Sequence, residues 1–234
     1  IPESLPAFAK APTHHDLKYL GLVNLAKSWT GLGFSQALNY AFCSEQKEKA
    51  FLGDLKGLRS LGLTISSEPV KLLNPLNEDL NMMRLSLTFG LWNNVLHNYR
   101  YGQAQGALFE TGSCFTKLDS VYKESIRLGA FAWGQAQDLW GKQNQESPVF
   151  KLKGALEVWA QKNRWNSLCI RAAKPTEVAP VFLHKGQWGV VEAEGQAIGF
   201  IGILHPELLD ENKIRASVGV LEIDRGQAAG DACE

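Results

Sequence analysis

The sequence lacks the features of a membrane-embedded or secreted chain. No apolar run approaches the roughly 18 residues that a membrane-spanning helix needs. The first residues do not follow the charged-then-apolar order of a signal peptide. These absences predict a soluble, cytoplasmic protein with no membrane partner. Because the chain begins at Ile1 in a proline-containing segment, without a methionine, we expect it to be a fragment of a longer polypeptide.

An excess of positive charge is also missing. The 234 residues include 24 Lys and Arg and 24 Asp and Glu. Nonspecific binding of nucleic acid depends on a concentration of basic side chains that neutralises phosphates, so the composition argues against a general nucleic-acid surface. A local basic stripe stays open, formed by Arg84, Arg100, Lys117, Lys123 and Arg127.

Cysteine is scarce and widely spaced. Cys43, Cys114, Cys169 and Cys233 form no C-x-x-C pair, which excludes the common zinc and thiol-redox motifs. No Cys, Asp or Glu accompanies His184 or His205 at metal-ligand spacing, and the pair His14-His15 could bind a metal only through distant partners. We therefore predict free thiols in a reducing compartment and no metal site.

What the sequence does contain is enough apolar material for a full core. Hydrophobic residues make up 45% of the chain, which suffices for one or at most two domains. Helical and strand periods alternate without repeats or low-complexity linkers. Helices are predicted over 16–30, 44–61 with Ser44 as N-cap, 88–101 and 151–162, and strands over 36–42, 107–115, 125–133, 167–172, 189–193, 197–204 and 218–223.

The connections between the later strands decide the fold class. The turn Glu194-Gly195 is typical of a tight β-hairpin. Strands joined by such short turns pair antiparallel, because a parallel crossover needs a dozen or more residues. We expect an α+β fold, an antiparallel sheet of about six strands with helices packed on one face.

The helix predicted over 88–101 has an unusually wide apolar face. Leu91, Val95 and Tyr99 repeat at helical spacing, while Trp92 and Leu96 widen the stripe beyond what a surface helix needs. Two interpretations have equal weight: packing inside its own domain, or burial at a subunit interface. In the second case the candidate interface residues are Trp92, Val95, Leu96 and Tyr99.

The segment from Leu72 to Phe115 carries an ordered set of motifs, and further motifs extend nearly to both ends of the chain. In this order they resemble the catalytic-like core of the bacterial phenylalanine-tRNA ligase beta subunit. The matching residues are Ile1-Pro2, Leu5-Pro6, Asn74-Pro75-Leu76, Met83-Arg84, Ser86-Leu87, Gly90-Leu91, Asn98, Gly102, Leu108-Phe109-Glu110, Gly112, Phe115, Phe150-Lys151-Leu152-Lys153-Gly154, Phe182-Leu183-His184, Ile201-Gly202, Leu204-His205-Pro206-Glu207 and Val220-Leu221-Glu222-Ile223-Asp224.

The resemblance implies the class II aminoacyl-tRNA synthetase catalytic fold over residues 1–234 as a single domain, without the active-site residues. Active class II enzymes carry an Arg two residues before the Glu of a central strand, in an f-R-x-E pattern, to hold the ATP α-phosphate. Leu108 stands at that position here, ahead of Glu110. The Gly-rich helix start with Glu-Arg, which grips the other end of ATP, is also missing after Val218. A lost transition-state donor costs about 3 to 4 kcal/mol, so we predict no catalytic and no cofactor-binding residue in this fragment.

Three polar residues are candidates for structural roles instead. Glu110, a lone carboxylate on an apolar strand, is either a relic of the ATP-binding acid or a core residue that pairs or caps, and we favour the second. The guanidinium of Arg84 offers a fork of donors that can tie two segments together. His205 lies in a family-like block without metal-ligand neighbours.

The resemblance also supplies a function. It implies a non-catalytic domain that pairs with the catalytic alpha subunit in an alpha2-beta2 phenylalanine-tRNA ligase, which uses ATP and magnesium and binds tRNA as a whole complex. The fragment alone is expected to be inactive and to bind no cofactor. Two alternatives stay open: a tRNA-contacting module, and a stand-alone class II-like ligase.

Overall fold

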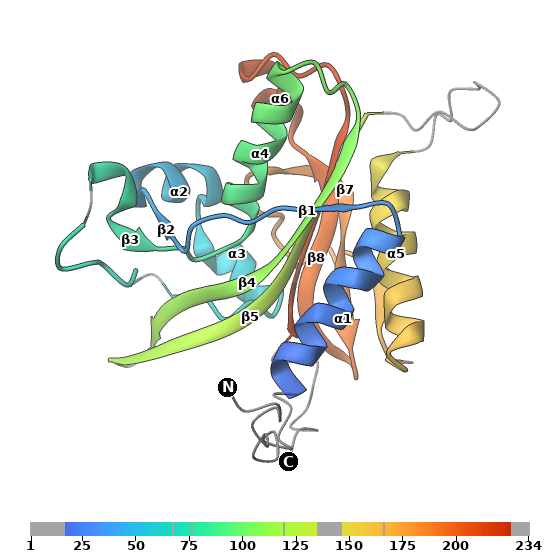
Figure 1. Cartoon of the computed structure of the whole chain (residues 1–234), viewed down its shortest axis with the longest axis horizontal. Coiled ribbons are helices and arrows are strands. Elements are labelled where there is room, and N and C mark those ends of the chain that lie inside the picture. Colours follow the sequence, from blue (N-terminus) through green and yellow to red (C-terminus); the bar gives the residue numbers. More distant parts are fainter. Residues whose placement is uncertain are drawn as a thin grey trace, which may run out of the picture.

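A seven-stranded mixed sheet forms the centre of the molecule, with strand order β1-β4-β5-β9-β8-β7-β6 (Figure 1). The computed structural model describes residues 17–66, 68–75, 77–118, 120–134, 147–165 and 167–225. The strands are β1 Ser35–Gln36, β4 Gly106–Leu118, β5 Val121–Trp133, β6 Cys169–Ala172, β7 Leu183–Ala193, β8 Gln196–Leu204 and β9 Val218–Asp224, and a separate two-stranded sheet joins β2 Phe42–Cys43 to β3 Met82–Met83.

The α+β class is confirmed, with two corrections to the predicted sheet. It has seven strands in the described part of the chain rather than about six, and it is not wholly antiparallel, because β1 pairs parallel to β4. The short-turn rule did not apply to this pair, since the chain runs from Gln36 to Gly106 before it returns to the sheet. All the other pairs of the large sheet are antiparallel.

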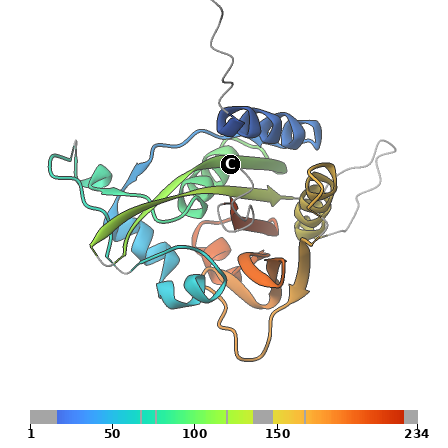
Figure 2. The ribbon, with the colours of Figure 1, turned by 90° about the horizontal axis from the view of Figure 1, so that it is seen from below.

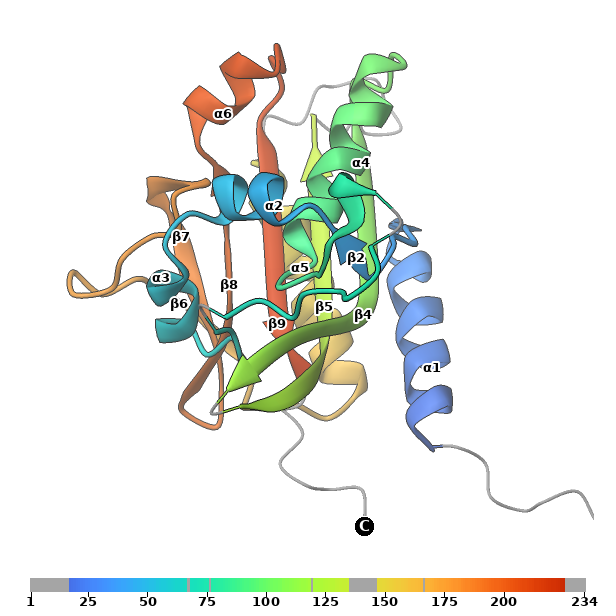
Figure 3. The same ribbon diagram turned by 90° about the vertical axis from the view of Figure 1, so that its left-hand side faces the viewer.

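Helices cover both faces of the sheet, so the prediction that they pack on one face was wrong. On one face lie α2 (Glu45–Leu52), α3 (Leu55–Ser60) and α4 (Thr88–Arg100), and on the other lie α1 (Leu17–Gly31) and α5 (Pro148–Lys162) (Figure 2, Figure 3). The central strands explain this, because alternate residues point to opposite faces and apolar residues occupy both sets. Phe131 packs in the core beneath α4, whereas its neighbour Ala130 packs in the core beneath α1 and α5.

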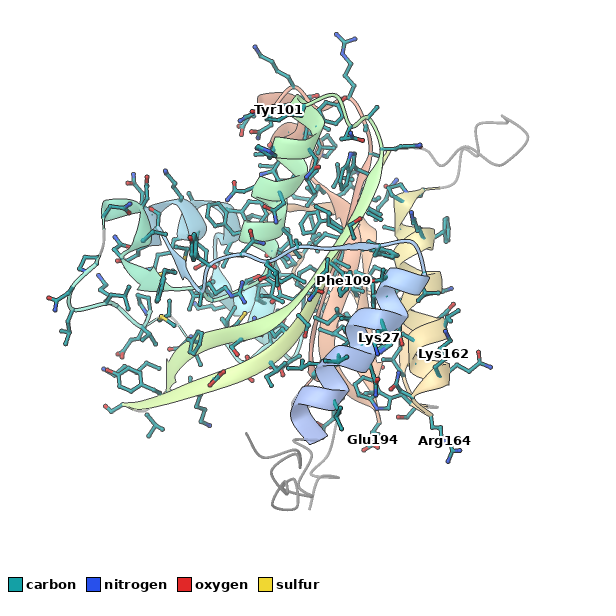
Figure 4. The ribbon with its side chains drawn as sticks, viewed as in Figure 1. Lys27, Tyr101, Phe109, Lys162, Arg164 and Glu194 are labelled. Carbon is teal, nitrogen blue, oxygen red and sulfur yellow. The ribbon has the colours of Figure 1, made fainter. Side chains whose placement is uncertain are left out.

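The core beneath α1 and α5 is built around aromatic contacts of α1. Trp29, which is completely buried, packs its ring against Phe34 at 4.9 Å and against Phe109 of β4 at 5.9 Å between ring centroids. Figure 4 labels Phe109 on the sheet beside α1. None of the helices in the described ranges is long and apolar enough to cross a membrane.

The predicted N-cap at Ser44 is confirmed, but the helix predicted over 44–61 is in fact two helices. The Ser44 side chain accepts a hydrogen bond from Lys47 N at the start of α2, as an N-cap does. The predicted single helix over 44–61 breaks at Gly53, which has φ 65°. Asp54 then caps α3 by accepting from Lys56 N at 3.0 Å.

Four further elements can be compared with the predictions from the sequence. The hairpin turn is confirmed, since Glu194 and Gly195 between β7 and β8 have φ 53° and 78°, which a tight two-residue turn requires. The predicted strand over 36–42 was wrong, because β1 ends at Gln36 and β2 begins only at Phe42. The sequence reading also missed the short helix α6 (Pro206–Glu211) and the 3-10 helix η1 (Glu78–Leu80).

Candidate functional site

The sheet face beneath α4 contains a cluster of buried charges. Burying an ionised side chain is costly unless it is paired and hydrogen-bonded, so each member needs an identifiable partner. Each of these residues is no more than 7% exposed: Glu48, Arg84, Glu110, Arg127, Glu222 and Asp224.

Arg84 and Glu110 form the first pair. The Arg84 Nη1 lies 2.5 Å from Glu110 Oε1, and Arg84 Nε donates to the Ser113 carbonyl oxygen at 2.9 Å. The other Glu110 oxygen accepts from Asn39 Nδ2 at 2.7 Å. Because Arg84 follows β3, Glu110 lies on β4 and Asn39 follows β1, these bonds join three segments that are far apart in the sequence.

Gly112 makes room for this pair. A Cβ atom placed on Gly112 would lie 2.2 Å from Arg84 Nη2, so the guanidinium occupies the space of the missing side chain. A larger residue here requires the Arg84 guanidinium to shift. The glycine of the motif L-F-E-x-G therefore has a packing reason in this fold.

Arg127 is the centre of the second group. This residue is completely buried on β5, and its Nη1 donates to Glu222 Oε1 at 3.0 Å and to the Leu85 carbonyl oxygen at 2.9 Å. Its Nη2 donates to the Thr64 carbonyl oxygen at 2.7 Å, and Asp224 Oδ2 lies 4.0 Å from its Nε. The guanidinium is thus neutralised and hydrogen-bonded within the domain.

Glu222 also holds the start of α4. One oxygen accepts from Leu87 N at 3.2 Å, and the other accepts from the Ser86 hydroxyl. Negative charge is favourable at a helix N-terminus, where backbone N–H groups lack intrahelical acceptors. The buried carboxylate therefore satisfies the entry to α4 as well as pairing with Arg127.

Glu48 contributes a third carboxyl, and its hydrogen bonds come from backbone amides and a thiol. It accepts from Leu85 N at 3.1 Å, from Ser86 N at 3.3 Å and from Cys43 Sγ at 3.2 Å. Burial raises the pKa of Glu48 to about 7, and these hydrogen bonds only partly offset that effect. The same burial, with the charge of Glu48 nearby, raises the pKa of the Cys43 thiol far above its ordinary value.

This raised pKa gives a testable pH dependence. The folded domain holds the Glu48 proton more tightly than the unfolded chain, so the contribution of Glu48 is complete below about pH 4.5 and is lost as the pH rises through about 7. We expect Glu48→Gln to remove a decline in unfolding free energy of up to about 1.4 kcal/mol per pH unit across this window. Urea unfolding of both proteins between pH 4.5 and 8 checks this. Parallel stability curves for the two proteins would contradict it.

Comparison with known proteins identifies the family of this chain. Residues 1–225 match the model of the phenylalanyl tRNA synthetase beta chain CLM domain. The chain belongs to this family. It is 42% identical over 229 residues to the phenylalanine–tRNA ligase beta subunit of Bdellovibrio bacteriovorus, covering 97% of this chain and 28% of that protein. It is 28% identical over 225 residues to the beta subunit of Francisella tularensis, covering 96% of this chain and 26% of that protein.

The CLM domain thus spans little more than a quarter of the length of these relatives. Its fold resembles that of a pyrrolysyl tRNA synthetase, PylSc of Desulfitobacterium hafniense, with a TM-score of 0.60. This likeness covers 91% of this chain and 69% of that one at 15% sequence identity, and at that identity it shows the fold alone.

Within the CLM domain, the broad apolar face of α4 packs against the core of the same domain. Trp92 and Val95, two of the predicted interface residues, are 3% and 0% exposed in the core beneath α4. The other two, Leu96 and Tyr99, are half-buried against the same core, and the Tyr99 hydroxyl accepts from Arg215 N at 3.2 Å. Within this chain, Trp92 and Val95 are therefore core residues.

The remaining predicted residues have clear places. Leu108 is half-buried on β4 and packs against the core beneath α4. His205 is the N-cap of α6, where its Nδ1 accepts from Glu207 N at 3.4 Å. From the sequence, Arg127 was named only in a possible basic stripe and Glu222 only within a matched motif, and Glu48 was not named. A usable signal existed for the first two, since Arg127 directly precedes the apolar run 128–133 of β5 and Glu222 directly follows the apolar run 218–221 of β9.

Proposed function

We propose that this domain is a non-catalytic module of a phenylalanine-tRNA ligase beta subunit and pairs with the catalytic alpha subunit in an alpha2-beta2 complex. Membership of the beta-chain family supports the assignment to this enzyme. The ATP, the magnesium and the chemistry of aminoacylation then belong to the whole complex, which acts on tRNA in the cytoplasm.

One observation carries the non-catalytic part of this proposal: both buried guanidinium groups on the sheet face are used internally. Adenylate formation needs a cation aimed at the developing charge of the ATP phosphate. Arg84 is paired with Glu110, and Arg127 is paired with Glu222. Neither is free for a phosphate.

The close packing of α4 supports the same conclusion. Gly129 of β5 lies directly under this helix, and a Cβ atom there would meet Leu91 Cδ1 at 2.8 Å and Leu87 Cβ at 3.0 Å. Side chains of the domain therefore fill the space over this part of the sheet. A nucleotide would have to displace α4 to reach it.

The outer face of α1 is suited to the pairing. Leu20 is 38% exposed, and Leu22, Val23 and Ala26 line a surface groove of about 640 Å³ between α1 and the edge of β4. A helix with apolar residues around most of its circumference is typical of a buried position, and its own domain buries Leu25 and Trp29 but leaves Leu22, Val23 and Ala26 only half-buried. A partner subunit would cover the rest.

Co-purification tests the proposal. We expect the chain, co-expressed with the alpha subunit of the same organism, to elute with it as one species in size-exclusion chromatography. Replacing Leu20 and Val23 by Asp should separate the two while leaving the circular dichroism spectrum of the chain unchanged. Independent elution of the unmodified chain and the alpha subunit at micromolar concentration would contradict the pairing.

A further inference from the structure

We propose that the buried chain of Arg84, Glu110 and Asn39 is a strut that holds Leu38 and Tyr40 in position as anchor residues for the alpha subunit. This inference rests on the proposed function, since it assigns part of the surface on which the two subunits pair. It gives Glu110 the task of positioning a loop, in place of any contact with ATP.

The segment between β1 and β2 displays two large side chains to solvent. Leu38 is 84% exposed and Tyr40 is 77% exposed. Large apolar side chains that are exposed next to each other can mark an interaction site. Aromatic and apolar anchors of this type dominate the energy of protein interfaces.

Asn39, the residue between these two, is held in place by the buried Glu110. Asn39 is half-buried, its Nδ2 donates to Glu110 Oε2 at 2.7 Å, and its backbone N lies 3.4 Å from Glu110 Oε1. Glu110 is held in turn by Arg84. The loop is also tied at each side, by Ala37 N donating to the Phe109 carbonyl oxygen and by Arg84 N donating to the Ala41 carbonyl oxygen.

A loop anchored in this way presents its side chains in a fixed arrangement. Ordering a flexible loop on binding costs free energy, and a loop that is already ordered avoids that cost. The strut therefore has an expected effect on affinity that is separate from its effect on folding. Through the side chain of Asn39, the strut connects the buried ion pair of Arg84 and Glu110 to the exposed loop.

A small groove adjoins the displayed loop. It has a volume of about 180 Å³, and its lining includes the rings of Tyr40, Phe42 and Phe89 together with the buried polar residues Ser86 and Arg84. A lining that combines aromatic and polar groups suits a partner side chain that has an apolar body and a polar tip. Anchor residues commonly pair with such pockets at interface centres.

The alpha subunit is the occupant that fits best, because this surface continues the one proposed on α1. The loop leaves directly from β1, and α1 packs on β1 (Figure 1). The groove along α1 includes Gln36, the last residue of β1, only two positions before Leu38. One partner can therefore cover both surfaces.

The test measures binding of the alpha subunit to the chain and to four variants by isothermal titration calorimetry. We expect Leu38→Ser with Tyr40→Ser to weaken binding on the order of 100-fold while the thermal midpoint stays within about 2 °C. Leu73→Ser with Tyr122→Ser is the matched control, since these residues are 98% and 69% exposed elsewhere, and it should bind like the unmodified chain. Asn39→Ala should weaken binding about 10-fold.

The positioning role makes a prediction that a merely structural role does not. Asn39→Ala should have no further effect once Leu38 and Tyr40 are already replaced, because it acts only through them. If the unmodified chain binds the alpha subunit and the Leu38, Tyr40 variant binds it equally well, this inference is wrong and the proposed pairing stands. If the unmodified chain fails to bind, both are wrong. Self-association of the chain that these replacements abolish would also overturn the inference, with a second copy as the occupant.

Discussion

Arg127→Met is expected to lower the free energy of unfolding by about 3 to 5 kcal/mol, the cost of breaking a buried ion pair from one side. The substitution removes the cation from beside the buried carboxylates of Glu222 and Asp224, and it removes the hydrogen bonds that Arg127 donates to the Leu85 and Thr64 carbonyl oxygens. Methionine fills much of the volume of the arginine side chain. The lost free energy of unfolding therefore comes from the missing charge and hydrogen bonds more than from a cavity. Urea unfolding followed by tryptophan fluorescence measures the difference.

The domain offers a matched control at its surface. Arg171 also bonds two carboxylates, Glu177 and Glu192, each at 2.6 Å, but all three side chains are partly open to solvent. Arg171→Met should cost about 1 kcal/mol or less, because water screens such pairs. Adding Glu222→Gln to Arg127→Met should recover part of the loss. Equal costs for the two arginine variants would contradict the account of the buried group.

Gly112→Val is expected to cost about 3 to 4 kcal/mol, although valine is favourable in most strands. The added side chain would occupy the position of Arg84 Nη2, which a Cβ atom alone would approach to 2.2 Å. Arg84 would then leave Glu110 buried without a cation. Thermal and urea unfolding of the variant measure the loss.

A double-mutant cycle separates this mechanism from a general intolerance of side chains at position 112. In a background with Arg84→Met and Glu110→Gln, the ion pair is absent from the start, so Gly112→Val should cost less than about 1 kcal/mol. Gly186→Val is the control for a strand glycine with open space, because its Cβ would lie 3.6 Å from the nearest atom. A full cost in the double-variant background would show that the guanidinium is not the obstacle.

The sequence predicted the elements with strong periods and signals. The helices over 88–101 and 151–162, the hairpin turn at Glu194-Gly195 and the strand over 218–223 are all found within a few residues. Their apolar spacing, turn residues and caps are local properties, which a single sequence displays directly. The α6 start at His205-Pro206 was missed because six residues give too short a period to detect.

The segment over 36–42 shows where local pattern fails. Its alternation of Leu38, Tyr40 and Phe42 is typical of a half-buried strand. In the fold, Asn39 turns toward Glu110, and the two neighbouring apolar side chains face outward. The deciding interaction joins residues that are 71 positions apart, and no local signal contains it.

The site could be predicted only in part for the same reason. Arg84 and Glu110 attract attention as charges beside apolar motifs, yet the sequence does not state that they meet. The wide face of α4 indicated burial, but not by which chain, and the fold places Trp92 and Val95 in its own core. Glu222 on β9, the partner of Arg127, lies 95 positions away in the sequence. The sequence alone therefore suggested that Arg127 is a surface residue.

Exchange of labelled pyrophosphate into ATP, with phenylalanine and magnesium present, is the most direct test of the central claim. We expect the purified 234-residue chain to give no phenylalanine-dependent exchange above background, because both buried guanidinium groups on the sheet face beneath α4 are neutralised internally. Adding the alpha subunit should make exchange appear. Exchange by the chain alone would contradict the account, since it would show an adenylation site that these residues do not leave open.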